Sequence, residues 1–372
     1  MLRLATVGTS IITRALLDAA SRVDGVAFVG TVSRDAERAA AFTAEHGGTQ
    51  AFTSVAEVAA SDEVDAVYLA SPNALHAAQA LTCIHGGKHV LVEKPFGANT
   101  REARAVMEAA DAAGVVAIEA MRLLHDPAWR ACQAALPELG RIRRANLHFG
   151  KYSSRYDLVL AGRQTNIFDC AMASGALMDI GIYTVNAMIG FFGAPERVSF
   201  APVLLDESTQ AVTHGPLDGA GVIVASYGSG LVASLNYSKI TNDLLTSQIE
   251  GEAGTLTINA ISVPSQARLD LRQAPGANAA GYSGISTASR ALELGARANS
   301  MEFELADFAA AVAAVQAGAV AAPAAAPCGP YGTVGDFQAA TLAALGVLDE
   351  CRRQAGIAFP ADADEPAAPV IE

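Results

Sequence analysis

Lys94 is the residue of this sequence whose surroundings point most directly to chemistry. It lies in the tripeptide Glu93-Lys94-Pro95, which follows the mostly apolar run 89–92. Such a run is typical of a buried strand, and the carboxyl end of a strand in an open α/β sheet faces the ligand crevice. We therefore predict that the Lys94 ammonium donates or accepts a proton there. Taken alone, the tripeptide is more typical of a solvated turn.

Asp179 and Tyr183 form the second set of residues suited to chemistry. They stand four residues apart in the segment 176–189, so in a helix they project from one face, one turn apart. A carboxylate and a phenol placed in this way can grip a carbonyl or hydroxyl group and protonate it. The alternative is structural: Asp179 caps a core helix and Tyr183 packs within it.

A turn near the N-terminus has features of a dinucleotide site. A strand expected at 1–7 runs into the turn 8–13 and a helix at 14–21. In such a unit the backbone N–H groups and the helix N-terminus receive a pyrophosphate. Gly8 is present, but Ser10 and Thr13 stand where the usual motif has its second and third glycines. The Ser10 hydroxyl offers a hydrogen bond in their place.

The end of the next strand indicates which dinucleotide is bound. The strand expected at 26–32 ends in Ser33-Arg34-Asp35, and Ser33 lies 25 residues after Gly8. Near this distance an NAD unit presents an acidic residue to the ribose, whereas an NADP unit presents arginine to the 2′-phosphate. Ser33 and Arg34 can both donate to a phosphate. We predict NADP; NAD stays possible if Asp35 only caps the next helix and Arg34 is a surface residue.

Strands and helices alternate through the first third of the chain. After the two strands above come a strand at 65–70, a turn at 71–73, a helix at 74–84, the Lys94 strand, a helix at 100–113 and a strand at 115–119. Asn99 and Glu102 are spaced like a capping box for the helix at 100–113. Strict alternation predicts an α/β fold with a doubly wound parallel sheet, the Rossmann arrangement.

Four motifs together resemble one enzyme family. They are Gly8-x-Ser10, Ser71-Pro72-Asn73-x-x-His76, Glu93-Lys94-Pro95 and the segment 175–183, Gly-Ala-Leu-Met-Asp-Ile-Gly-Ile-Tyr. In order and spacing they are similar to those of the glucose-fructose oxidoreductase and inositol dehydrogenase (Gfo/Idh/MocA) family, to about residue 357. The branch of dihydrodiol dehydrogenase and NADP-linked xylose dehydrogenase is most similar, because Tyr183 stands where many relatives carry histidine. The first turn departs from the family pattern by lacking two glycines.

The resemblance implies roles for individual residues. His76 would lie on the rim of the nicotinamide pocket, and Glu93 would contact the cofactor ribose or structure the turn. Arg122 faces the crevice and either binds substrate, with Asp179 and Tyr183, or pins the hinge. The predicted cofactor-binding residues are Gly8, Ser10, Ile11, Ile12, Ser33, Arg34, Ser71, Asn73, His76, Glu93 and Lys94.

Hydride transfer to a carbonyl requires a proton for the developing alkoxide, and the reverse reaction requires a base. Lys94 serves in both directions if the nicotinamide and a partly desolvated pocket lower its pKa toward neutrality. Tyr183 would hydrogen-bond the same oxygen and share or take over the proton transfer. Asp179 would bind a neighbouring hydroxyl and hold the Lys94 ammonium. Which of Lys94 and Tyr183 is the principal acid stays open, as does the isomer of the Lys94-Pro95 bond.

The pattern changes after residue 122. The runs 222–227 and 231–237 flank Gly228-Ser229-Gly230, a hairpin signal, and 244–250 and 255–258 form a further strand pair. We predict an α+β domain at 123–357 with an open, largely antiparallel sheet, after a Rossmann domain at 1–122. The polar and aromatic segment 152–168 is typical of a loop over substrate. The segments 277–289 and 358–372 are expected to be a mobile loop and a disordered tail.

Composition narrows the range of partners. The 372 residues are 51% hydrophobic, enough for two domains. The net charge of −13 argues against nucleic acid, and we expect no membrane segment and no signal peptide. Five scattered cysteines without Cys-x-x-Cys spacing suggest neither disulfides nor a metal site, which fits a cytoplasmic location. The resemblance implies a homodimer or homotetramer formed through the second sheet.

We therefore predict an NAD(P)-dependent oxidoreductase acting on a secondary alcohol or carbonyl of a sugar, polyol or cyclic diol. One alternative is a non-catalytic dinucleotide-binding sensor, against which the intact Lys94, Asp179 and Tyr183 weigh. Another is a glycosidase-like member that retains its dinucleotide.

Overall fold

The first sheet is parallel and six-stranded. The computed structural model describes residues 1–273 and 287–363, and the strands of this sheet run in the order β3-β2-β1-β4-β5-β6. All its pairings are parallel. The strands are β1 (Leu2–Val7), β2 (Val26–Val32), β3 (Gln50–Phe52), β4 (Ala66–Leu69), β5 (His89–Glu93) and β6 (Ala117–Ala120). The order reverses between β1 and β4, where a crevice for ligands is expected. The predicted doubly wound sheet is confirmed.

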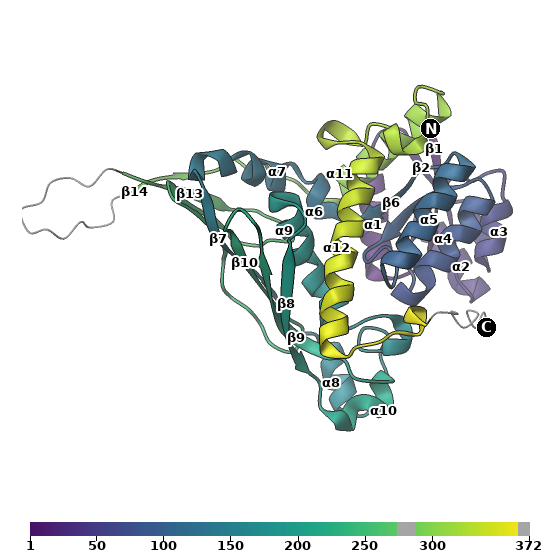
Figure 1. The fold of residues 1–372 in the computed structure, drawn as a ribbon. Coiled ribbons are helices and arrows are strands. Elements are labelled where there is room, and N and C mark those ends of the chain that lie inside the picture. Colours follow the sequence, from purple (N-terminus) through teal and green to yellow (C-terminus); the bar gives the residue numbers. More distant parts are fainter. Residues whose placement is uncertain (274–286, 364–372) are drawn as a thin grey trace, which may run out of the picture.

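Helices connect these strands and pack against the sheet (Figure 1). They are α1 (Ile11–Ala20), α2 (Ala36–Glu45), α3 (Val55–Ala60), α4 (His76–His85) and α5 (Thr100–Ala113). The expected start of the first helix at residue 14 was wrong, because the backbone N–H of Arg14 already donates to the Ser10 carbonyl at 3.1 Å. Asp35 caps α2 by accepting from the Arg38 N–H, and Asn99 caps α5 by accepting from the Glu102 N–H.

The second sheet has eight strands in the order β14-β13-β12-β11-β7-β10-β9-β8. Among the described strands of this second sheet, only β10 and β7 pair in parallel, and the other pairings are antiparallel. The strands are β7 (Ile142–Gly150), β8 (Arg197–Leu204), β9 (Asp218–Ser226), β10 (Val232–Ser238), β11 (Ser247–Gly251), β12 (Gly254–Ile258), β13 (Ala267–Arg272) and β14 (Thr287–Ala291). The β9–β10 hairpin and the β11–β12 pair confirm the predicted, largely antiparallel architecture.

The remaining α-helices follow the first sheet in the sequence, and some of them connect the two sheets. They are α6 (Arg122–His125), α7 (Pro127–Ala134), α8 (Ser154–Leu160), α9 (Ile182–Phe192), α10 (Gln210–Thr213), α11 (Met301–Gln316) and α12 (Val334–Ala355). Helix α9 packs on β7 and β10, while α12 contacts α5 and β6 on one side and α9 and β8 on the other. The long yellow helix α12 therefore lies between the two sheets (Figure 1). Helix α12, near the end of the chain, thus packs against both parts of the molecule and does not belong to the second part alone.

The two faces of the second sheet differ in how far they are covered. On β9, Ile223 and Ala225 are buried, whereas the alternating Val222 and Val224 are exposed. Val232 on the neighbouring β10 is also exposed. Alternation of this kind places one face of a sheet on the core and the other toward solvent or a partner. Helices α9 and α12 lie on the side toward the first sheet (Figure 1).

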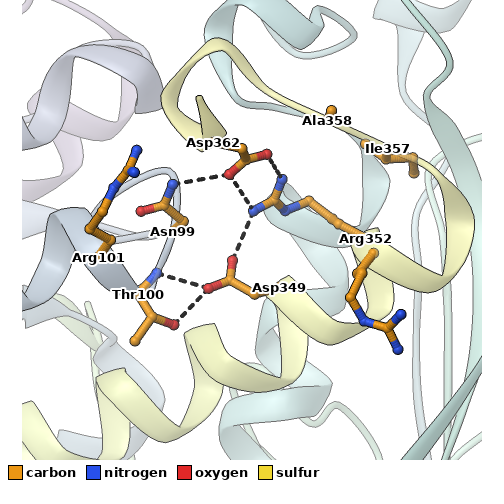
Figure 2. Close-up of a pocket in the computed structure, with 9 residues that line it drawn as sticks. Asn99, Thr100, Arg101, Asp349, Arg352, Ile357, Ala358 and Asp362 are labelled. Carbon is orange, nitrogen blue, oxygen red and sulfur yellow. Dashed lines mark hydrogen bonds and ion pairs between the residues drawn. The ribbon is translucent and has the colours of Figure 1, made fainter. Parts of the chain in front are cut away.

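The segment expected to be a disordered tail begins in an ordered conformation. Phe359 is only 4% exposed, and residues 360–362 form a short 3-10 helix. Asp362 pairs with Arg352 and accepts from Asn99, while Asp349 accepts from the N–H and hydroxyl of Thr100 (Figure 2). These contacts override the polar composition that suggested disorder. They line an open pocket of about 530 Å³, which none of the predicted catalytic residues lines.

Three further expectations concern the chain as a whole. Of the expected mobile loop, residues 277–286 lie outside the described residues, and 287–289 belong to β14. Residues 364–372 of the tail lie outside them as well. The stretch Cys170–Phe192 is long and apolar enough to cross a membrane, but 78% of its most apolar window is buried inside the protein. It is thereby placed in the core.

Candidate active site

Lys94 follows β5 and reaches across to the second half of the chain. Its ammonium nitrogen lies 2.7 Å from the Oδ1 atom of Asp179 and 2.8 Å from the Asp179 backbone oxygen. The Lys94 side chain is 13% exposed. Strand β5 is buried throughout, which fixes the position of its end and therefore the point from which the Lys94 side chain extends. The two residues expected to cooperate are therefore in direct contact.

Asp179 lies in a π-helical turn, Leu177–Gly181, which precedes α9. The regular α-helical spacing expected for Asp179 and Tyr183 was therefore wrong. The turn begins after Gly175, whose φ of +130° and close approach to Asp218 exclude a side chain. The Asp218 carboxylate also accepts from the Leu177 N–H at 2.7 Å. Isolated π turns occur often at functional sites.

Lys239 is a site residue that the sequence analysis missed. It directly follows β10, and its ammonium forms an ion pair with the Oδ2 atom of Asp179. Each oxygen of the Asp179 carboxylate thus contacts a different lysine. The available signal was a charged residue at the end of a strand with alternating polarity, Val232–Ser238, since strand ends are where ligand-contacting groups gather in this kind of fold.

The charges at this point reinforce one another. Burial opposes the ionised form of Asp179, but Lys94 and Lys239 outweigh burial and hold its pKa well below the ordinary value. Burial would likewise lower the pKa of Lys94, but Asp179, Tyr183 and Glu93 outweigh it and raise that pKa. The Lys94 pKa lies above its ordinary value in this arrangement because a carboxylate contacts the ammonium directly, and its expected lowering beside a nicotinamide stays a prediction.

Tyr183 lies beside the same lysine. Its ring centroid is 5.2 Å from the Lys94 nitrogen and 5.9 Å from the centre of the Arg122 guanidinium. Phe149 meets the ring edge to face at 5.4 Å. Burial raises the pKa of the Tyr183 phenol, opposed by the two cations. The phenol is therefore a neutral donor at physiological pH, held between a lysine and an arginine.

Glu93 and His76 are placed as supports of the lysine turn. The Glu93 carboxylate is buried and accepts from the Tyr68 hydroxyl at 2.5 Å and the Lys94 N–H at 3.2 Å. The two ring nitrogens of His76 lie 2.8 Å from the backbone oxygens of Pro95 and Ser71. The Lys94-Pro95 peptide bond is cis. Both side chains hold the turns after β4 and β5, and their contacts with a cofactor stay predictions.

The first turn fits a pyrophosphate. Gly8 has a φ of +100°, and a Cβ there would lie 3.0 Å from the Ala70 oxygen, so glycine allows β1 and β4 to approach closely. Helix α1 has no acidic residue in its first turn, and the Ser10 and Thr13 hydroxyls lie 3.3 Å apart beside it. Ile11 is 86% exposed. Free N–H groups and an uncovered apolar side chain are suited to a dinucleotide.

The predicted ribose and nicotinamide contacts Arg34, Ser71 and Asn73 all follow strands of the first sheet. Arg34 is exposed after β2, and within the described part of the chain Asp35 pairs with Arg38 rather than with Arg34. The amide of Asn73 donates to the Ala173 oxygen at 2.9 Å, which ties the turn after β4 to the segment before Asp179. The Ser71 hydroxyl donates to Gln79. A guanidinium free of carboxylate partners is suited to a 2′-phosphate.

Two family models match the chain. Residues 2–121 match the oxidoreductase family with an NAD-binding Rossmann fold, and residues 135–257 match the GFO/IDH/MocA C-terminal domain. The chain belongs to the Gfo/Idh/MocA family. It is an NAD(P)-dependent oxidoreductase, as the sequence analysis predicted.

Relatives within the Gfo/Idh/MocA family include members of the predicted branch. The chain is 39% identical to scyllo-inositol 2-dehydrogenase (NADP(+)) of Bacillus subtilis, over 73% of this chain and 80% of that protein. It is 32% identical to D-xylose 1-dehydrogenase (NADP(+)) 2 of Haloferax volcanii, over 65% and 71% of the two chains. The fold is similar to that of a 3-ketoreductase from Actinomadura kijaniata in complex with NADP and TDP-benzene, with a TM-score of 0.75, 22% identity and coverage of 95% and 97%.

Proposed function

We propose that this protein interconverts a secondary hydroxyl group and a ketone on a cyclic polyol or sugar, with NADP as its cofactor. The observation that carries the proposal is the contact of 2.7 Å between Lys94 and Asp179. It brings an ammonium from the nucleotide-binding half against a carboxylate from the other half. The relatives support the substrate class, since scyllo-inositol, xylose and the dihydrobenzene diol in their names all carry neighbouring hydroxyl groups.

The residues of the site divide the work of the reaction. NADP, when bound, would supply the hydride chemistry. Lys94 takes the hydroxyl proton during oxidation and returns it during reduction. Tyr183, beside the ammonium, hydrogen-bonds the same oxygen and keeps the substrate in line. Asp179 holds Lys94 in place and can accept a hydrogen bond from a neighbouring substrate hydroxyl.

The substrate class can be tested with the purified protein and NADP⁺. Scyllo-inositol, xylose and a cyclic trans-diol are offered in turn, and the absorbance of reduced cofactor is followed. We expect turnover with at least one ring that carries neighbouring hydroxyls, and a loss of about 10²–10⁴-fold after Lys94→Ala. No turnover by wild type across cyclitols, aldoses and diols would favour a sensor instead. A tightly held cofactor that is not consumed during sugar cleavage would favour the glycosidase-like alternative.

The preference for NADP is supported by the exposed Arg34 and by Ser33. One charge-assisted phosphate contact contributes roughly 1.5–3 kcal/mol. Replacing Arg34 with Ala should therefore weaken NADP⁺ binding about 10- to 100-fold and leave NAD⁺ binding nearly unchanged. Arg38→Ala on the same segment is the matched control. Equal affinity of wild type for both cofactors, measured by calorimetric titration, would contradict the proposal.

We propose a homodimer or homotetramer formed through the open face of the second sheet. Exposed Val222, Val224 and Val232 on adjacent strands support this, since apolar side chains gathered on one face are suited to burial against a second copy. Val222→Lys with Val224→Lys should then convert the oligomer to monomer in light scattering. A wild type that is monomeric at micromolar concentration would contradict the proposal.

We also propose a cytoplasmic location and no nucleic-acid or membrane partner. The five cysteines are buried and unpaired, which is typical of a reducing compartment. The net charge of −13 opposes binding to phosphate backbones. Recovery of the protein in a membrane or secreted fraction, or a mobility shift of DNA at physiological salt, would contradict these statements.

A further inference from the structure

Lysine is rare in this chain, and its distribution is informative. The sequence contains four lysines: Lys88, Lys94, Lys151 and Lys239. Two of them contact the same carboxylate, with Lys94 on Oδ1 and Lys239 on Oδ2 of Asp179. The Lys239 side chain is 11% exposed, so this second ammonium is no solvated surface charge. A single lysine would already neutralise the half-buried Asp179 carboxylate, so the presence of a second lysine needs an explanation.

The proposed reaction creates a difficulty for a simple Lys94–Asp179 pair. When Lys94 is the base, it must be neutral before it receives the hydroxyl proton. A neutral Lys94 would leave the Asp179 carboxylate without a counter-charge in a partly desolvated site, which is costly. That cost is what raises the Lys94 pKa, and it opposes the proton transfer itself.

We propose that Lys239 is the permanent counter-cation of Asp179 and thereby lets Lys94 lose and regain its proton during turnover. The inference rests on the proposed function of Lys94. In oxidation, the substrate O–H bond would break with its proton going to the neutral Lys94 nitrogen. The C–H bond of the same carbon would break with its hydride going to bound NADP⁺, and the C–O bond would become the C=O bond of the product. Asp179 stays paired with Lys239 throughout. Lys239 acts through Asp179 and is a positioning residue.

The surroundings of Lys94 offer no substitute for this arrangement within the described residues. The charged and titratable groups around it lie on five elements: Glu93 at the end of β5, Glu119 on β6, His76 on α4, Arg122 on α6 and Tyr183 on α9. Arg122 stacks near the Tyr183 ring, and the Glu93 carboxylate is engaged by Tyr68. Only Lys239 places a cation directly on Asp179 in addition to Lys94.

The backbone of Lys239 is fixed, as the role requires. Its N–H donates to the Gly219 oxygen at 2.9 Å, and its carbonyl accepts from the Ser153 N–H at 2.9 Å. The residue therefore sits between the start of β9 and the segment that follows β7. A counter-cation held in this way stays in position while the proton on Lys94 comes and goes.

The test is a titration of Lys94 itself in the NADP⁺ complex. Protein labelled with ¹³C only in lysine has few signals, and the Cε shift of each reports its protonation. The Lys94 signal is assigned with Lys94→Arg. The variant Lys239→Met removes the charge and keeps the length, Lys239→Arg restores a charge, and Lys88→Met is a matched control at the far end of β5.

We expect Lys239→Met to raise the pH at which Lys94 titrates by about one unit, because a charge at this range shifts a pKa by about that much or more. Lys239→Arg should return most of the shift, and Lys88→Met should leave it unchanged. Coincident titrations of wild type and Lys239→Met would overturn the proposal. A Lys94 that stays protonated in both proteins up to alkaline unfolding would also overturn it, since such a lysine needs no counter-cation.

Kinetics separate this inference from the proposed function. With the best substrate found, the pH dependence of kcat/KM for oxidation should move to higher pH in Lys239→Met by the same amount as the titration. If Lys94→Ala retains near-wild-type turnover, the proposed function of Lys94 fails, whatever Lys239 does. If Lys94→Ala is inactive and Lys239→Met shifts neither profile, only the role of Lys239 fails.

Discussion

Two groups of ionisable side chains meet at Lys94, and the protein treats them in opposite ways. On the crevice side, Asp179 is held ionised between Lys94 and Lys239. On the core side, Glu93, Glu119 and Glu304 are buried, and burial raises the pKa of all three. The first group consists of charges that compensate one another. The second consists of carboxyl groups whose ionised form is disfavoured by burial.

The difference shows at which groups a change of protonation costs little free energy and at which groups it lowers the stability of the fold. A carboxylate with an ammonium on each oxygen keeps its charge while one neighbour changes protonation. A buried carboxyl with neutral partners can ionise only at a cost to the fold. We therefore expect the catalytic role to belong to the crevice group, and the pH dependence of stability to the core group.

The strongest test of this division is Lys94→Ala. Removing a positioned acid–base group typically lowers turnover by about 10²–10⁴-fold. Affinity for NADP⁺ should change far less, because the ammonium contacts Asp179 rather than the phosphate-binding turn. Single-turnover rates and cofactor titration provide the two numbers. Lys88→Ala, at the opposite end of β5, is the control, and near-wild-type turnover of Lys94→Ala would break the comparison.

Glu119 tests the core group through pH. Its carboxylate accepts from the Phe96 N–H and the Thr341 hydroxyl, and burial raises its pKa from 4.5 to about 7. Between these two pH values the folded protein keeps a proton that the unfolded chain releases. The stability that protonated Glu119 contributes is therefore complete below about pH 4.5 and is lost as pH rises through about 7. The loss is on the order of 3 kcal/mol.

Glu119→Gln cannot ionise, and its free energy of unfolding should fall less steeply over this pH range than that of wild type. Urea unfolding at several pH values provides the slopes. Glu138→Gln, an exposed surface change, should leave the slope unaltered. Parallel slopes for wild type and Glu119→Gln would show that Glu119 does not carry this pH dependence.

Tyr183→Phe sharpens the crevice side of the comparison. The ring contacts with Lys94, Arg122 and Phe149 persist in phenylalanine, so the change removes little more than the hydroxyl. If Lys94 is the principal acid and base, turnover should fall by about 10-fold or somewhat more, which corresponds to one lost hydrogen bond. A loss larger than that of Lys94→Ala would assign the principal role to the phenol.

Glu304 provides an effect of the opposite sign, a gain in stability. It lies on α11, and neither of its carboxyl oxygens has a hydrogen-bond partner among the described residues. Glu304→Met should therefore stabilise the protein by about 1–3 kcal/mol, the cost of an unsatisfied buried polar group. The gain should grow with pH, because wild-type Glu304, with its raised pKa, loses stability as pH rises. Destabilisation at every pH would mean that the carboxyl has a partner in solution.

The sequence by itself determined the fold class and the position of the central lysine. Alternation of strands and helices depends on the periodicity of neighbouring residues, so the parallel sheet and the bounds of β2 and α5 were predictable. Lys94 was recognisable because a strand end in such a sheet has one functional side. The hairpin β9–β10 followed from its glycine-containing turn for the same local reason.

Only the tertiary structure decided how the charges are paired. Lys239 is 60 residues from Asp179, which is itself 85 residues from Lys94. No local pattern links positions so far apart. The π turn at Leu177–Gly181 depends on the hydrogen bond from the Leu177 N–H to Asp218, a residue on β9. Protonation is decided at the same level, because the energy of a charge depends on its desolvation and on the nearest opposite charge, and packing alone sets both.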